Sequence, residues 1–341
     1  MKSVIDRFLS KSFLITKKIL LSNKRIRNAV FDVYNNEEFS DFYEHEKMLA
    51  DAKRVDTYQQ AISKLIGPGD IVVDLGTGSG ILSLFAVQSH AKKVYAIDHS
   101  EFIEIAKEVS LRNGGSEIIF EKVNSRSFNP PEKMDVILHE QIGDDLFDEN
   151  MIENIFDLKR RILKPGGRVI PGKFELFLEP VSLKPEFRVP YIWENKLHGV
   201  DFSFLEEREL GKKYKPAGYR FRYLPPYSID FFLCKPEPVL SFDLNDDISE
   251  IDFRIKPQKR FVKNDGTLDG LCLYFITIFD DETQFDTSPA NGHHSWSNRF
   301  FRTERVAYLK GEQLSFNVHM PSPLIANTWD IEMQEPVKYH L

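Results

Sequence analysis

The chain has 341 residues, which is enough for two domains with hydrophobic cores of their own. Its formal net charge of −7 and pI near 5.8 argue against a broad nucleic-acid-binding face, since such a face needs a basic surface. No apolar run is long enough to span a membrane, and Cys234 and Cys272 form neither a disulfide framework nor a zinc ligand set. We therefore expect a protein of a reducing compartment, the cytoplasm, with no metal site, no nucleic-acid partner and no membrane span.

Residues 1–36 are both basic and apolar. Lys17 and Lys18 interrupt what could otherwise be a signal-peptide core, and the apolar residues recur at helical spacing. We predict one or two amphipathic helices here. The pattern is compatible with packing on the protein itself or on a dimer partner, and also with docking on a membrane surface or a substrate.

The next part of the chain, residues 37–171, alternates helical patterns with short runs rich in β-branched residues. Residues 37–66 are expected to be mainly helical. The expected strands are IVVDLG (71–76), KVYAID (93–98), IIFEKV (118–123) and MDVILHE (134–140). The later helices are expected at 81–90, at 101–114 and from 151 to the stop that Lys-Pro-Gly-Gly provides at 164–167. Strands that alternate with helices predict an α/β fold with a parallel, doubly wound, Rossmann-like sheet.

After about residue 172 the pattern changes to short alternating stretches with many prolines. The stretches are FELFLEPVSL (174–183), IDFRIKPQKRFV (251–262), LCLYFITIFD (271–280), RVAYLK (305–310) and LSFNVHM (314–320). They predict an antiparallel β-sandwich or barrel over residues 172–341, with an irregular insert at about 185–235.

A glycine-rich loop follows the first expected strand and opens a helix. It contains Asp74, Gly76 and Gly78, and Asp98 ends the next strand. Glycines let the backbone approach a ligand, and an acid at the end of the second strand suits a ribose diol, which fits a dinucleotide or S-adenosylmethionine (SAM). Because Asp74 is unhelpful beside a pyrophosphate but tolerable beside a sulfonium and an ammonium, the pattern favours SAM.

An acidic loop follows the fourth expected strand and carries Glu140 and Glu149. Open α/β sheets bind their ligands at the carboxyl ends of central strands, so we expect both carboxylates to face a cationic substrate. The competing interpretation is a solvated acidic loop, because Asp144, Asp145 and Asp148 crowd the same segment.

With these motifs the chain resembles the protein arginine methyltransferase family. The segments that carry the resemblance are HEKMLADAKRVDTY (45–58), VVDLGTGSG (72–80), HEQIGDDLFDENM (139–151), IWENKLHGVDFS (192–203) and TSPANGHHSW (287–296). It extends over about residues 37–320. It implies a SAM-binding domain, a β-barrel-like substrate domain with a dimerisation arm at about 185–235, a head-to-tail homodimer, and methyl transfer to a guanidino nitrogen of arginine.

The resemblance also implies roles for single residues. Arg54 would pair with the carboxylate of SAM, a task suited to a guanidinium. Asp98 would hold the ribose, and Val123 and Asn124 would lie along the adenine. The other implied cofactor-binding residues are Phe42, His45, Met48, Asp74, Gly76, Gly78 and Met151. The bond between Ile170 and Pro171 falls at an inter-domain proline that is commonly cis in the family.

For the acceptor, the family implies a clamp formed by Glu140 and Glu149, with Trp296 and His294 as further catalytic residues. Several positions depart from the family pattern. The family has tryptophan where this chain has Gln141, tyrosines at Asp144 and Asp148, histidine at Ser295 unless His293 or His294 takes its place, and Tyr-Phe at Asn35–Asn36. The acceptor therefore stays open between protein or peptide arginine and a small guanidino molecule, and a catalytically idle SAM-binding scaffold is a further alternative.

Overall fold

The computed structural model describes residues 41–209, 211–212, 221–292 and 294–334. The expected helices of residues 1–36, the Asn35–Asn36 pair and His293 lie outside this range. None of the described helices is long and apolar enough to cross a membrane.

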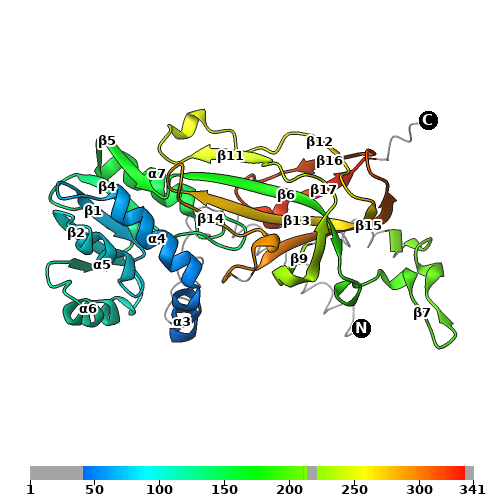
Figure 1. Ribbon diagram of the computed structural model, residues 1–341, viewed down its shortest axis with the longest axis horizontal. Coiled ribbons are helices and arrows are strands. Elements are labelled where there is room, and N and C mark those ends of the chain that lie inside the picture. Colours follow the sequence, from blue (N-terminus) through cyan, green and yellow to red (C-terminus); the bar gives the residue numbers. More distant parts are fainter. Residues whose placement is uncertain (1–40, 210, 213–220, 293, 335–341) are drawn as a thin grey trace, which may run out of the picture.

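The first half of the described chain forms a five-stranded parallel sheet with strand order β3-β2-β1-β4-β5 (Figure 1). The strands are β1 (Ile71–Leu75), β2 (Lys93–Asp98), β3 (Ile119–Lys122), β4 (Met134–His139) and β5 (Leu163–Ile170), and the helices are α3 (Phe42–Ala50), α4 (Ala52–Leu65), α5 (Ile81–Gln88), α6 (Ile103–Arg112) and α7 (Met151–Ile162). The four strands expected from the sequence are confirmed. Strand order reverses between β1 and β4, which is the point where such sheets bind ligands.

Helix α7 ends at Ile162, directly before the stop expected at residues 164–167. These residues belong to β5, a fifth strand that was not expected, which pairs with β4 through an irregular register between Met134 and Val136. Pro165 explains why the helix stops before it, since proline has no N–H to donate and its ring disfavours helical backbone in the preceding residue.

The second half is antiparallel, as expected, and its main sheet has seven strands in the order β10-β6-β13-β15-β9, with β11 also on β6 and β14 on β13. These strands are β6 (Lys173–Leu183), β9 (Phe221–Leu224), β10 (Ile229–Phe232), β11 (Leu240–Asp243), β13 (Gly266–Ile278), β14 (Gln284–Asp286) and β15 (Asn298–Tyr308). A smaller sheet contains β12 (Gln258–Phe261), β16 (Gln313–His319) and β17 (Asp330–Met333). The long strand expected at 251–262 is wrong in its first part, because residues 251–257 are irregular and only β12 pairs.

The two halves share one hydrophobic core. Phe147 from the loop after β4, Phe174 from β6 and Phe242 from β11 stack in series, with ring centroids 5.9 and 5.4 Å apart. The peptide bond between Ile170 and Pro171, where the chain passes from one half to the other, is cis as expected. The acidic loop after β4 is thus packed directly against the β half.

The insert expected to be irregular over 185–235 is only partly so, because residues 221–224 and 229–232 form β9 and β10 of the main sheet. Its first part forms a projecting arm with a two-stranded hairpin of β7 (Lys196–Leu197) and β8 (Val200–Asp201). In Figure 1 it extends from the end of the antiparallel sheet that lies farthest from the parallel sheet. Short 3₁₀ turns complete the fold at Ser125–Ser127, Pro185–Phe187, Ile192–Glu194, Ser203–Leu205, Pro226–Ser228, Ile248–Glu250, Pro289–Asn291 and Ala326–Thr328.

Candidate functional site

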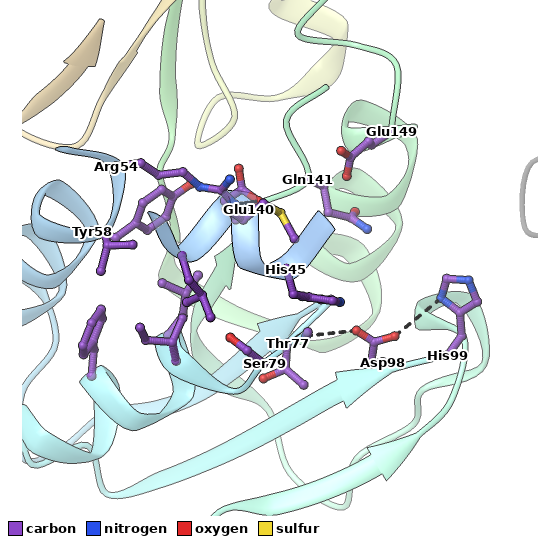
Figure 2. A pocket seen from close by; sticks show the side chains of 18 residues that line it. His45, Arg54, Tyr58, Thr77, Ser79, Asp98, His99, Glu140, Gln141 and Glu149 are labelled. Atoms are coloured by element: carbon purple, nitrogen blue, oxygen red, sulfur yellow. Dashed lines mark hydrogen bonds and ion pairs between the residues drawn. The ribbon is translucent and has the colours of Figure 1, made fainter. Parts of the chain in front are cut away.

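A cavity lies at the carboxyl ends of β1, β2 and β4, beneath α3 and α4 (Figure 2). Its lining includes His45, Met48, Arg54, Tyr58, Gly76, Thr77, Gly78, Ser79, Asp98, Glu140, Gln141 and Glu149. Residues from the glycine loop and from the acidic loop therefore border one space. Among the described residues no group of His, Cys, Asp and Glu side chains is arranged to hold a metal ion.

The glycine loop turns tightly beside this cavity. Gly76, Gly78 and Gly80 all have positive φ angles, of 71°, 51° and 81°. Residues other than glycine rarely adopt this backbone conformation. A Cβ atom on Gly78 would also lie 3.0 Å from Cε1 of His45, so the loop needs glycine for close approach as well as for conformation. Helix α5 begins at Ile81, directly after the loop.

Asp74 lies below the loop and does not line the cavity. Its side chain is fully buried and accepts hydrogen bonds from Thr77 Oγ1 at 2.7 Å and Ser83 Oγ at 2.6 Å. Burial raises its pKa to about 6, and these two hydroxyls counteract the rise. The observed contacts of Asp74 hold the loop onto α5, whereas the sequence argument had placed the carboxylate beside the ligand.

Asp98 faces the cavity from the end of β2. Its carboxylate accepts hydrogen bonds from the backbone N–H of Gly78 at 3.0 Å and of Ser100 at 2.8 Å. His45 covers the same end of the loop, buried and stacked on Phe102 with ring centroids 3.6 Å apart. The carboxylate is thus fixed by backbone groups and still borders the open space.

The other expected cofactor residues lie around the cavity without lining it. Phe42 is 59% exposed and touches Phe102 edge-on. Val123 donates its N–H to the carbonyl of Asp98, Asn124 caps a short turn, and Met151 is fully buried in the core at the start of α7. Met48, the second methionine among the implied cofactor-binding residues, does border the cavity.

Arg54 and Glu140 form an ion pair inside the cavity. The guanidinium also contacts Met48 Sδ at 3.5 Å and lies 4.9 Å from the ring of Trp296. Oε1 of Glu140 is buried and has no hydrogen-bond partner among the described residues. Burial raises the pKa of Glu140 to about 7, although Arg54 acts in the opposite direction. One oxygen of this carboxylate is therefore available to a donor entering the cavity.

Glu149 borders the same cavity, on the far side of Gln141 from Glu140 (Figure 2). The loop between the two glutamates is tightly folded. A Cβ on Gly143 would lie 2.6 Å from the Cβ of Asp148, and Leu146 and Asn150 both have positive φ angles. This folding returns the chain to the cavity before α7 begins, so the structure brings together the two glutamates that the sequence singled out.

Residues 296–299, which lead into β15, hold this loop at three points. Trp296 donates its indole N–H to the carbonyl of Ile142 at 2.7 Å, and the backbone N–H of Ser297 donates to Asp144 Oδ1 at 2.8 Å. Arg299 forms a bidentate ion pair with Asp145, and both side chains are fully buried. Trp296 does not line the cavity. Its ring packs on Phe275 and Phe285 and lies near the guanidinium of Arg54.

The segment before Trp296 holds the start of α4. Ser295, at the position of the family histidine, donates its backbone N–H and its hydroxyl to Asp51 Oδ2 at 2.8 and 3.1 Å. Asp51 caps α4 by accepting the N–H of Arg54 at 3.1 Å. His294 is buried and does not line the cavity. In this chain the serine thus supports the turn from which Arg54 projects.

The structure shows two further residues, His139 and Arg299, that support the site and that the sequence did not single out. His139 is fully buried, and burial lowers its pKa to about 4. Its Nε2 lies 3.0 Å from the carbonyl of Pro171 and its Nδ1 accepts the N–H of Gln141 at 3.4 Å, which assigns the neutral Nε2–H tautomer. The second residue is Arg299. The sequence offers one indication of its role, which is that this arginine stands among aromatic and β-branched residues in a strand-like stretch.

The chain is similar in sequence and in fold to known methyltransferases. The family described as ribosomal protein L11 methyltransferase (PrmA) matches residues 57–172. The chain is 30% identical to protein arginine N-methyltransferase 6 of Xenopus laevis over 276 residues, which is 76% of this chain and 77% of that protein. It is 35% identical over 176 residues to the probable protein arginine N-methyltransferase 6 of Arabidopsis thaliana, covering 51% of this chain and 40% of the relative.

Among solved structures, the Trypanosoma brucei PRMT1 enzyme-prozyme heterotetrameric complex with AdoHcy contains a chain that matches with a TM-score of 0.69 and 23% identity. The match covers 86% of this chain and 92% of that chain. At this level of identity the likeness concerns the fold. Both halves of the chain, in this order, therefore have a counterpart in a solved structure.

Proposed function

Because the chain belongs to the protein arginine N-methyltransferase family, whose methyl donor is SAM, we propose that it methylates a guanidino nitrogen of arginine in a protein or peptide. The observation that carries this proposal is the position of Glu140 and Glu149 on the cavity that the glycine loop borders. A cation entering this cavity meets two carboxylates beside the place proposed for the methyl donor.

The cavity suits SAM at three points. The positive-φ glycines bring backbone close to the ligand, and Asp98 offers a carboxylate to the ribose hydroxyls. Arg54 can exchange its partner Glu140 for the carboxylate of the cofactor, because a guanidinium binds carboxylates in the same forked geometry. When bound, SAM supplies an electrophilic methyl group on a sulfonium.

The two glutamates supply what a guanidino acceptor needs. Its pKa above 12 makes the symmetric guanidinium a poor nucleophile. Charge-assisted hydrogen bonds donated by the guanidinium to Glu140 and Glu149 would hold positive charge on two nitrogens and leave electron density on the nitrogen that faces the methyl group. Alignment of this nitrogen can contribute about 7–11 kcal/mol to lowering the barrier. One of the two carboxylates then accepts the proton that the methylated nitrogen loses.

The test is an incubation with labelled SAM and a set of arginine peptides, followed by acid hydrolysis and mass spectrometry. We expect methylarginine in the peptides. Free arginine, used as a parallel acceptor, distinguishes the small-molecule alternative, since methylation of free arginine as efficient as that of peptides would overturn the peptide assignment. SAM binding without methylation of any guanidino acceptor would favour the idle scaffold.

We predict that acceptor use depends on pH through Glu140. The carboxylate must be ionised to bind a guanidinium, and burial raises its pKa to about 7. Activity is therefore expected to rise as pH increases through about 7, and kcat/KM for the acceptor should fall about tenfold per pH unit below it. The measurement is kcat/KM at saturating SAM between about pH 5.5 and 8.5. A flat profile would contradict the assignment of Glu140 as an ionised clamp residue.

We also propose that the arm joins two copies of the chain. Leu197, Val200 and Phe204 of the arm each expose 55–56% of their surface, an unusual density of exposed apolar groups. Light scattering should give twice the chain mass of 39.7 kDa. Leu197→Asp combined with Val200→Asp should give the monomer. Leu309→Asp, at a 64% exposed position outside the arm, serves as the matched control and should leave the dimer intact.

A further inference from the structure

A second cavity, which we name the arm-root cavity, lies where the projecting arm leaves the antiparallel sheet. It is bordered by the end of β6, residues 187–195, β9 and β15, and its volume is about 500 Å³. This falls in the range of about 300–1,000 Å³ typical of small-molecule sites. None of the proposed methyl-transfer residues lines it, so it is separate from the first cavity.

The lining of the arm-root cavity is strongly cationic. It contains Arg188, Arg222, Arg302 and Arg305, and a single carboxylate, Asp269. Four guanidinium groups around one space repel each other, and the resulting positive potential attracts an anion.

The nearby carboxylates are already engaged. Asp269 is buried and accepts the N–H of Leu183 at 2.9 Å and Nε of Arg188 at 3.1 Å, while Arg305 lies 3.5 Å away. Arg188 also pairs with Glu194 at 2.9 Å. Among the described residues Arg222 forms no ion pair; its guanidinium donates to the carbonyl of Phe221. Arg222 thus brings uncompensated charge to the cavity, and Arg305 shares the single carboxylate of Asp269 with Arg188.

The walls are aromatic and already held in place. Tyr191 is buried and stacks on Trp193, with ring centroids 4.9 Å apart, and the guanidinium of Arg302 lies 3.7 Å from the Tyr191 ring. Tyr223 also lines the cavity, and its hydroxyl accepts a hydrogen bond from Arg299 at 2.8 Å. Phe300 from β15 is nearly fully buried and adds apolar surface. A preformed apolar wall beside cations favours a ligand that has both an apolar body and an anionic group.

We propose that the arm-root cavity binds a small organic anion in which a phosphate or carboxylate group is attached to an apolar or aromatic body. Guanidinium groups match both oxyanions through paired hydrogen bonds, so the recognition chemistry is shared. The aromatic walls select against the bare inorganic ion. This proposal does not depend on methyl transfer and can be tested on the full chain without an acceptor.

Titration calorimetry with phenyl phosphate and with benzoate tests the site. At least one of them should bind saturably with one equivalent per chain, and the stronger of the two identifies the anionic group. Inorganic phosphate and benzyl alcohol, which each lack half of the ligand, should bind at least about tenfold more weakly. Absence of saturable binding by both aromatic anions, or equal binding of benzyl alcohol, would overturn the proposal.

The double variant Arg222→Gln/Arg305→Gln locates the binding. Arg222 is exposed and the Arg305 side chain is 50% exposed, so neither change should unfold the chain, which a thermal melt verifies. Affinity for the aromatic anion should fall at least about tenfold, since two charge-assisted contacts are lost. Arg254→Gln/Lys259→Gln removes the same charge at positions outside the cavity and should leave affinity unchanged. Equal affinity in the two double variants would refute the assignment to this cavity.

Discussion

Replacing Glu149 with glutamine is expected to lower kcat/KM for an arginine peptide by roughly 10²–10³-fold. Glutamine keeps the size of the side chain and one acceptor oxygen but removes the negative charge. The guanidinium would then enter a partly buried cavity with a single carboxylate partner, Glu140. Losing one partner of a buried charge pair costs about 3–5 kcal/mol. We expect part of this cost to raise the free energy of the transition state.

This variant separates the acceptor from the donor. Arg54 and Asp98, the residues we propose for SAM, are unchanged in this variant and both line the cavity, so affinity for S-adenosylhomocysteine should change little. The measurement is steady-state kinetics with the peptide together with calorimetry of the cofactor product. Glu46→Gln makes the same chemical change at an exposed position of α3 and should leave both quantities unchanged. Full turnover by Glu149→Gln would exclude the clamp.

Local sequence patterns predicted the features that depend on interactions between residues close together in the chain. Runs of β-branched residues predicted β1 and β4, because strands buried on both faces of a parallel sheet are apolar throughout. The loop around Gly76 and Gly78 needs glycine for conformation and for space, and both needs are visible in the sequence. Glu140 and Glu149 meet at one cavity because each flanks a rigid element.

The remaining features depend on contacts between distant segments. Asp74 looks like a ligand-binding acid in the sequence, yet its contacts to Thr77 and Ser83 stabilise the loop from below. Trp296 reaches the carbonyl of Ile142, 154 positions away, so no local pattern reveals that it holds the acidic loop. The acidic residues around Glu140 likewise suggested a solvated loop, whereas Asp145 is fully buried against Arg299.

The ion pair between Arg299 and Asp145 carries the second large effect. Arg299→Met should lower the free energy of unfolding by about 3–5 kcal/mol, since it leaves the carboxylate of Asp145 buried without its cation. Tyr223 would remain as a hydrogen-bond donor at 3.3 Å. Urea unfolding measures the change. Arg254→Met, which breaks an exposed pair with Asp252, is the control and should cost less than about 1 kcal/mol.

A double-mutant cycle distinguishes this pair from a simple packing effect. Asp145→Asn in the Arg299→Met background removes the buried negative charge that Arg299→Met leaves unpaired. The double variant should therefore be more stable than Arg299→Met alone. Asp145 lies between Glu140 and Glu149, so the same pair anchors the loop that carries both. At a temperature where Arg299→Met is still folded, peptide methylation should fall while cofactor binding is kept. If Arg299→Met were as stable as the native chain, the loop would have to be held by its contacts to Trp296 and Ser297 alone.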